Sequence, residues 1–210
     1  MGTFERFGTL IVLLVCTSGT ALAQPTAETP QFKVGDSWTF ARIDGFKNER
    51  TGSFTHTVAA VTSGHVQMDT KTPSRVLPTA LTSEGNVVEA FGTKNSPHYS
   101  MLSFPLSVGK KWEAKYDWSS SSAKGSGENT VEVVAVEKVV VPAGTFEAFK
   151  LRYSGTYTVS GFPGLGRKTS TYWYAPTARQ IIREEYSSTD TQGKPYHRWI
   201  NELESYKVVE

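Results

Sequence analysis

A strict alternation of apolar and polar residues is the feature that most constrains the fold of this chain. In Lys111–Ser119 one face carries Trp112, Ala114, Tyr116 and Trp118, and the other face carries only charged or small polar residues. This period of two is typical of a β-strand with one buried face. Phe149–Val159 repeats the pattern with aromatic and aliphatic residues on one face, interrupted by Gly155.

Other segments rich in β-branched and aromatic residues predict further strands, separated by glycine, proline and serine. They are Ser37–Ile43, Phe54–Thr62, Val131–Val141, Thr169–Tyr174, Arg179–Ser187 and Tyr196–Tyr206. A single short helical turn is expected, within Pro73–Leu81. The pattern therefore predicts an all-β fold: a single curved antiparallel sheet, forming a half-open β-barrel or a barrel-like sandwich with little helix.

The amino terminus has the order of a secretory signal. Arg6 is followed by the apolar run Leu10–Cys16 and then by the small residues around Ala23. Such an order predicts a signal peptide over residues 1–23, cleaved after Ala23, and a periplasmic or secreted protein. A short membrane anchor and a lipoprotein signal ending at Cys16 remain alternatives, although lipoprotein signals prefer a small residue where Val15 stands.

The remaining chain is predicted to hold one domain. Residues 24–31 contain two prolines and little apolar surface, so we expect a flexible linker there and a single antiparallel β domain over residues 32–210. The lone cysteine leaves with the signal, which excludes disulfides and thiol chemistry. The net charge is +2, too balanced to favour a nucleic-acid partner, and no second apolar stretch is long enough to be a transmembrane segment.

No motif of a catalytic or metal-binding site is present in the sequence. The four histidines (His56, His65, His98 and His197) follow no metal-binding spacing, and no G-x-S-x-G sequence occurs. The pair Glu184-Glu185 lies on a predicted strand, where neighbours point to opposite faces. We therefore predict no catalytic residue, no metal and no cofactor, and a chain that is not an enzyme.

The sequence contains one internal echo. Val34-Gly35-Asp36-Ser37-Trp38 matches Val108-Gly109-Lys110-Lys111-Trp112 in the pattern V-G-x-x-W, and each copy opens a predicted strand. We expect each glycine to lie in a turn and each tryptophan to be the first inward residue. Two interpretations stay open: an ancient duplication, or the same type of turn used independently at two places.

Aromatic residues are the main indication of function, with five Trp and nine Tyr in the chain. They either fill the core or line a concave sheet that accepts an apolar ligand. The glycine-rich segment Gly161–Gly166 is expected to be a hairpin loop or a lip that touches a ligand or partner. The candidate contact residues are Phe162, Leu165, Trp38, Trp112, Tyr116, Trp118, Tyr153 and Tyr157.

Three runs carry a resemblance to known proteins: Val141–Phe146, Tyr172–Pro176 and Ile181–Glu184. Over roughly residues 105–205 the chain resembles uncharacterised exported proteins of Gram-negative bacteria, which are similar to the half-open β-barrels of periplasmic lipoprotein carriers and their outer-membrane receptors. The resemblance implies an antiparallel sheet curved around an apolar cavity. The chain departs from the carriers because no helices are predicted that would plug the open side of the barrel.

The leading hypothesis is an exported protein that binds or carries an apolar or amphipathic small molecule, such as a lipid. One alternative is a cell-envelope interaction or assembly protein that acts through protein–protein contacts. A second alternative is a hydrolase built from dispersed residues.

Overall fold

The computed structural model describes Gly2 and residues 24–210. The predicted signal peptide lies outside these residues, apart from Gly2, and stays a prediction. The strands are β1 (Thr26–Ala27), β2 (Ser37–Asp44), β3 (Glu49–Thr62), β4 (His65–Lys71), β5 (Val76–Thr82), β6 (Val87–Ala90), β7 (Thr93–Tyr99), β8 (Leu106–Ser107), β9 (Lys111–Ser119), β10 (Lys124–Val141), β11 (Gly144–Val159), β12 (Phe162–Ala175), β13 (Gln180–Thr189) and β14 (Pro195–Lys207). One 3₁₀ turn, η1 (Pro176–Ala178), joins β12 to β13.

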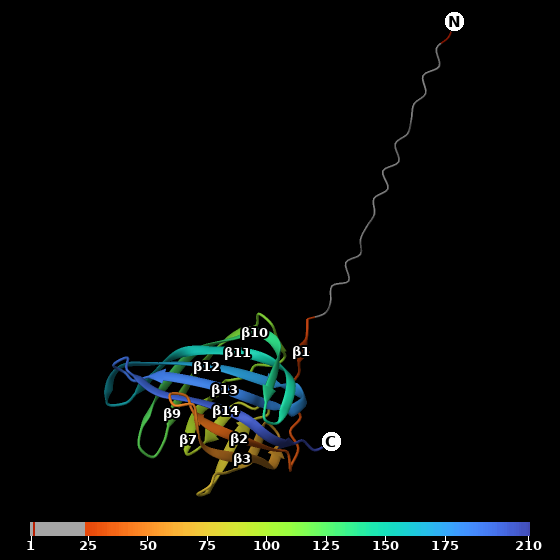
Figure 1. The fold of residues 1–210 in the computed structure, drawn as a ribbon. Coiled ribbons are helices and arrows are strands. Elements are labelled where there is room, and N and C mark those ends of the chain that lie inside the picture. Colours follow the sequence, from red (N-terminus) through yellow and green to blue (C-terminus); the bar gives the residue numbers. More distant parts are fainter. Residues whose placement is uncertain (1, 3–23) are drawn as a thin grey trace.

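Twelve of these strands form one closed antiparallel barrel (Figure 1). Each barrel strand pairs with the next one along the chain, and the last strand, β14, pairs with the first, β2. The shortest seams surround β6 and β7: two residue pairs join β5 to β6, and three pairs join β6 to β7 and β7 to β9. The turns that follow β11 and β13 lie at the end of the barrel opposite the C-terminus (Figure 1).

The predicted all-β fold with little helix is confirmed, and β9 has the bounds that the alternation predicted. The barrel is closed, however, whereas the sequence predicted a half-open barrel or a sandwich. Closure comes from β14, whose residues Trp199–Lys207 pair along the whole of β2. A closed barrel leaves no unpaired sheet edge, so it needs no plugging helix.

Three local predictions were wrong. The helical turn expected within Pro73–Leu81 is instead strand β5, paired with β4 along its whole length. Ser119–Gly127, where the serines and glycines of the sequence predict a flexible tip between strands, is instead a short turn at residues 120–123 followed by the start of β10. The expected loop Gly161–Gly166 contains the start of β12, so the β11–β12 turn is confined to Ser160 and Gly161.

The segment 24–31 is packed, where a flexible linker was expected. Thr26 and Ala27 form β1, which pairs with Ser107 and Leu106 of β8. Ala27 is buried against a core cluster that also contains Leu106. The two prolines do not prevent this arrangement, because neither lies within the paired residues.

The V-G-x-x-W echo marks two structurally equivalent turns. Gly35 and Gly109 both have positive φ, and their amides donate to the carbonyls of Val58 and Val133. In turn, the amides of those valines donate to the carbonyls of Asp36 and Lys110. Both long strands are also bulged just past these valines. Each copy thus opens a run of six barrel strands, β2–β7 and β9–β14, which favours the duplication over a turn solution used twice.

Glycines on the inner face make room for aromatic rings in the second half of the barrel. Gly127 lies opposite Tyr116 on β9, and Gly166 lies opposite Tyr157 on β11. A Cβ at either glycine would overlap the facing ring. Such pairs let a ring lie against a neighbouring backbone, and they bring several tyrosines together inside the barrel.

Candidate functional site

A cavity of about 260 Å³ lies inside the barrel, between strands of the first half and the last three strands. Its apolar wall is built from inward-facing side chains, namely Phe40, Phe54, Met68, Leu81, Phe91 and Met101. Phe91, in the β6–β7 turn, is the exposed member of this group and packs edge-on against Phe54. The mouth of the cavity therefore lies beside Phe91.

The opposite wall holds a chain of polar side chains. Arg42 on β2 donates from Nε to Oδ1 of Asn201 at 3.0 Å, and Asn201 on β14 donates from Nδ2 to Oε2 of Glu184 at 2.6 Å. The carboxylate and the guanidinium are thus bridged by an amide instead of forming a direct ion pair. The guanidinium also lies 4.9 Å from the ring of Trp199, a cation–π distance.

This wall keeps hydrogen-bonding capacity that no described residue uses. Burial raises the pKa of Glu184, opposed by its bond from Asn201 and by the charge of Arg42. Burial lowers the pKa of Arg42. Trp199 Nε1 lies near Glu184 but has no hydrogen-bond acceptor within the described part of the chain. The wall therefore offers both donors and acceptors, with balanced charge, to a polar group in the cavity.

His56 on β3 adds a second polar group to the cavity. Its Nδ1 lies 2.7 Å from Oγ1 of Thr70, which in turn lies 2.6 Å from Oγ1 of Thr79. Burial lowers the pKa of His56 to about 4, so the ring is neutral near pH 7. The ring packs against Phe54 and Phe40 and contributes to the aromatic lining of the cavity.

The buried histidine makes the protein sensitive to acid. The pKa of His56 in the folded protein, about 4, is below the ordinary value of 6.5, so the stability it provides is present above pH 6.5 and is lost as the pH falls toward 4. Wild-type protein should lose about 1.4 kcal/mol per pH unit in this window. We expect His56→Gln, which cannot titrate, to lack this loss in urea unfolding at pH 7 and pH 5. The control His65→Gln, at an exposed position of β4, should lose stability like wild type, and equal pH dependence of all three proteins would contradict the assignment.

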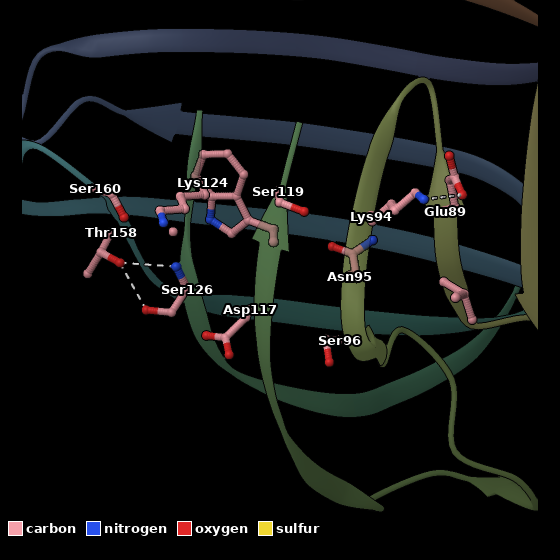
Figure 2. Close-up of a pocket in the computed structure, with 13 residues that line it drawn as sticks. Glu89, Lys94, Asn95, Ser96, Asp117, Ser119, Lys124, Ser126, Thr158 and Ser160 are labelled. Carbon is pink, nitrogen blue, oxygen red and sulfur yellow. Dashed lines mark hydrogen bonds and ion pairs between the residues drawn. The ribbon is translucent and has the colours of Figure 1, made fainter. Parts of the chain in front are cut away.

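A second pocket, of about 750 Å³, lies where β7, β9 and β10 meet (Figure 2). Its lining is polar: Ser126 and Thr158 are joined by hydrogen bonds, and Lys94 lies 3.8 Å from Glu89 (Figure 2). Although this pocket is larger, none of its lining residues is buried. The cavity inside the barrel, where buried polar groups converge on apolar walls, is the better candidate site.

The structure does not gather the eight predicted contact residues into one place. Trp38 is fully buried in the core, and Trp112 packs half-buried against a second core cluster. Tyr116 and Tyr153 lie together inside the barrel, whereas Trp118 lines the polar pocket. Tyr157 donates to the carbonyl of Thr189 at 2.8 Å. Phe162 and Leu165 are exposed on β12, at 67% and 57%.

The residues that line the cavity with polar atoms were not identified from the sequence. Arg42, Glu184 and Asn201 occupy inward positions of strands that were predicted correctly. Continuing the alternation would have found them: Asn201 lies two residues from the inward Trp199 and Leu203, and Glu184 two residues from the inward Ile182. The signal that could have found them is a polar residue at a strand position where the alternation places an inward-facing apolar residue.

No group of three or more His, Cys, Asp or Glu residues among those described is arranged to hold a metal ion. No helix in the described part of the chain is long and apolar enough to cross a membrane.

No protein family matches the sequence, and a search of curated proteins finds no relative. Two solved structures are similar in fold. One, described as an exported protein with a YmcC-like fold from Bacteroides fragilis, superposes with a TM-score of 0.57 at 17% identity, over 86% of this chain and 99% of that chain. The other, described as a lipoprotein from Parabacteroides distasonis, gives a TM-score of 0.55 at 16% identity, over 88% and 100%. At this identity the likeness extends to the fold alone.

Proposed function

We propose that the chain is an exported binding protein that holds a small amphipathic molecule in the cavity inside the barrel. The observation that carries the proposal is the pairing of an apolar aromatic wall with the buried chain Arg42–Asn201–Glu184. Export is supported by the signal-like amino terminus and by the two structures of similar fold, which are described as an exported protein and a lipoprotein. The role is binding or carriage, without chemistry on the ligand.

The size of the cavity limits the ligand. Pockets for drug-sized molecules enclose about 300–1,000 Å³, so 260 Å³ suits one short acyl or aromatic group and excludes a whole diacyl lipid. Burying each methylene of such a group contributes about 0.8 kcal/mol, against an association cost of about 4–15 kcal/mol. A short apolar group alone therefore binds weakly, and the polar wall must supply the rest. Because that wall is charge-balanced, it favours a neutral or zwitterionic head group.

Tryptophan fluorescence tests this proposal, because Trp199 forms part of the cavity wall. We expect saturable fluorescence changes when detergent-free protein is titrated with monomeric short-chain amphipaths that carry neutral or zwitterionic heads. Val87→Phe, which fills the cavity from β6, should abolish the change. The matched control Val76→Phe, at an exposed position of β5, should bind like wild type. Titrations without saturation, or unaltered binding by Val87→Phe, would contradict the proposal.

A matched pair of substitutions, at Glu184 and at its neighbour Glu185, tests the role of the polar wall. Glu184 faces the cavity, whereas its neighbour Glu185 points outward and pairs with Arg183 at 2.7 Å. A hydrogen bond to a charged group contributes about 1.5–3 kcal/mol, so Glu184→Gln should weaken binding about tenfold or more. Glu185→Gln should leave the affinity unchanged. Equal affinities of the two variants would show that the head group does not contact Glu184.

A contact role in the cell envelope is the second candidate. Phe162 and Leu165 project from the β11–β12 hairpin with most of their surface exposed, and exposed apolar side chains of this kind are often found at protein interfaces. Crosslinking in intact envelopes, compared between wild type and Phe162→Ser, tests it. A crosslinked partner that the substitution removes would support this role.

A further inference from the structure

Lys168 is a buried cation inside the barrel, on the inner face of β12. Its side chain is 7% exposed, and its ammonium lies 4.9 Å from the ring of Tyr99, 4.8 Å from Tyr116 and 5.7 Å from Tyr153. Nζ donates one hydrogen bond, to the hydroxyl of Tyr116. No carboxylate of the described residues pairs with this ammonium, and burial lowers its pKa to about 7.

The ammonium of Lys168 keeps unused hydrogen-bond donors, and several buried hydroxyls on the same inner surface are unpartnered within the described part of the chain. An ammonium has three N–H donors, of which one is used. The hydroxyls of Tyr153, Ser170 and Ser188 are buried and have no partner within residues 24–210. Tyr153 Oη lies near the hydroxyls of Tyr99 and Tyr116 without forming a hydrogen bond to either.

These hydroxyls lie on the same inner surface as the lysine. Ser188 on β13 is the direct cross-strand partner of Lys168, and Ser170 follows two residues later on the same face of β12. Side chains in these relations lie about 5–7 Å apart. Of the unpartnered buried side-chain atoms near this surface, only the Oδ1 of Asn129 can accept without donating.

A buried cation with free N–H donors and no paired carboxylate among the described residues favours an anion, toward which the neighbouring hydroxyls can also donate. A water molecule brings as many donors as acceptors, whereas a carboxylate only accepts. Bonds from charged donors to a carboxylate are also about twice as strong as neutral ones. We propose that the side chains of Lys168, Tyr153, Ser170 and Ser188 together bind a carboxylate.

The carboxylate has two possible sources, a free small acid or the acidic end of a molecule in the cavity. Tyr172 lines the cavity, and its hydroxyl lies 3.3 Å from that of Tyr99, whose ring contacts the lysine. This tyrosine pair therefore connects the wall of the cavity to Lys168. The second source rests on the proposed function, and the first does not.

Thermal unfolding at pH 6 with three probes distinguishes the sources: acetate as the free acid, octanoate as acid plus chain, and octanol as chain alone. Equal concentrations of chloride correct for ionic strength. For a free-acid site, acetate should raise the melting temperature of wild type by about 5–10 °C at a hundredfold excess over its Kd. If the site binds the acidic end of a longer ligand, octanoate should raise the melting temperature by this amount and octanol should raise it less.

The titratable groups facing Lys168 are Tyr99, Tyr116 and Tyr153, whose pKa values burial raises. Only the lysine loses its charge near neutrality, so the shift in melting temperature caused by the acid should shrink at pH 8.5.

Two variants complete the test. Lys168→Met should abolish the response to both acids, and Tyr153→Phe, which keeps the lysine, should weaken it several-fold. Lys115→Met, on the outer face of β9, is the matched control and should respond like wild type. Responses that survive in Lys168→Met, or no response of wild type to either acid, overturn the inference. If octanol binds and neither acid binds better, the inference fails while the proposed function stands. If acetate alone raises the melting temperature, the inference stands, and binding of an eight-carbon chain in the cavity is refuted.

Discussion

Lys168→Met should raise the free energy of unfolding at pH 6, in carboxylate-free buffer, by about 2–4 kcal/mol. The pKa of Lys168 is lowered from 10.5 to about 7 by burial, which corresponds to a cost of about 5 kcal/mol for the buried cation. Methionine has a similar length and packs well against aromatic rings. The variant also loses the cation–π contacts and the bond to Tyr116, which offsets part of the gain.

The pH dependence gives this prediction its sign. A lowered pKa means that the stability of the wild type is highest above pH 10.5 and falls as the pH drops toward 7. The advantage of Lys168→Met should therefore be largest at or below pH 7 and should shrink by about 1.4 kcal/mol per pH unit between pH 7 and pH 9. Urea unfolding at pH 6 and pH 9 measures both effects, with Lys115→Met as the exposed control. A loss of stability in Lys168→Met at pH 6 would contradict the proposed cost of the buried charge.

Local alternation predicts much of this fold because it reflects which face of a strand is buried. The predicted segments of β9 and β11, Lys111–Ser119 and Phe149–Val159, carry large apolar residues on one face only. Strand β5 was missed because Pro78 and short polar residues obscure its pattern, although its neighbours in the sheet impose the strand. The closure of the barrel could not be predicted, since the β14–β2 pairing joins residues far apart in the sequence.

The candidate site was harder to predict than the fold, for a physical reason. A polar residue on a strand is ordinarily assigned to the wet face, and Lys168 stands next to Arg167 in a segment that looks exposed. Its burial depends on Tyr99, Tyr116 and Tyr153 arriving from three other strands. Only the alternation of inward and outward positions along β12, followed back from Tyr172 through Ser170, places this lysine inside the barrel.

Trp38→Ala is expected to lower the free energy of unfolding by about 4–6 kcal/mol. Trp38 has no exposed surface and packs edge-on against Phe32. Removing a buried aromatic side chain costs about 3–5 kcal/mol. Its Nε1 also donates to the carbonyl of Ala178 in η1 at 2.7 Å, and leaving that buried acceptor unpaired costs about 1–3 kcal/mol more.

The equivalent substitution in the second half, Trp112→Ala, should be milder, although both tryptophans follow the same V-G-x-x-W pattern. Trp112 is half-buried, and its Nε1 donates to Ser100 over a longer distance of 3.2 Å. Since less apolar surface and a weaker bond are lost, we expect about 2 kcal/mol. Urea unfolding of both variants makes the comparison, and Trp38→Phe separates packing from the hydrogen bond. Equal losses would mean that the two tryptophans stabilise the fold equally. A larger loss at Trp38 would show that its contact with η1 stabilises the barrel beyond what the equivalent position contributes in the second half.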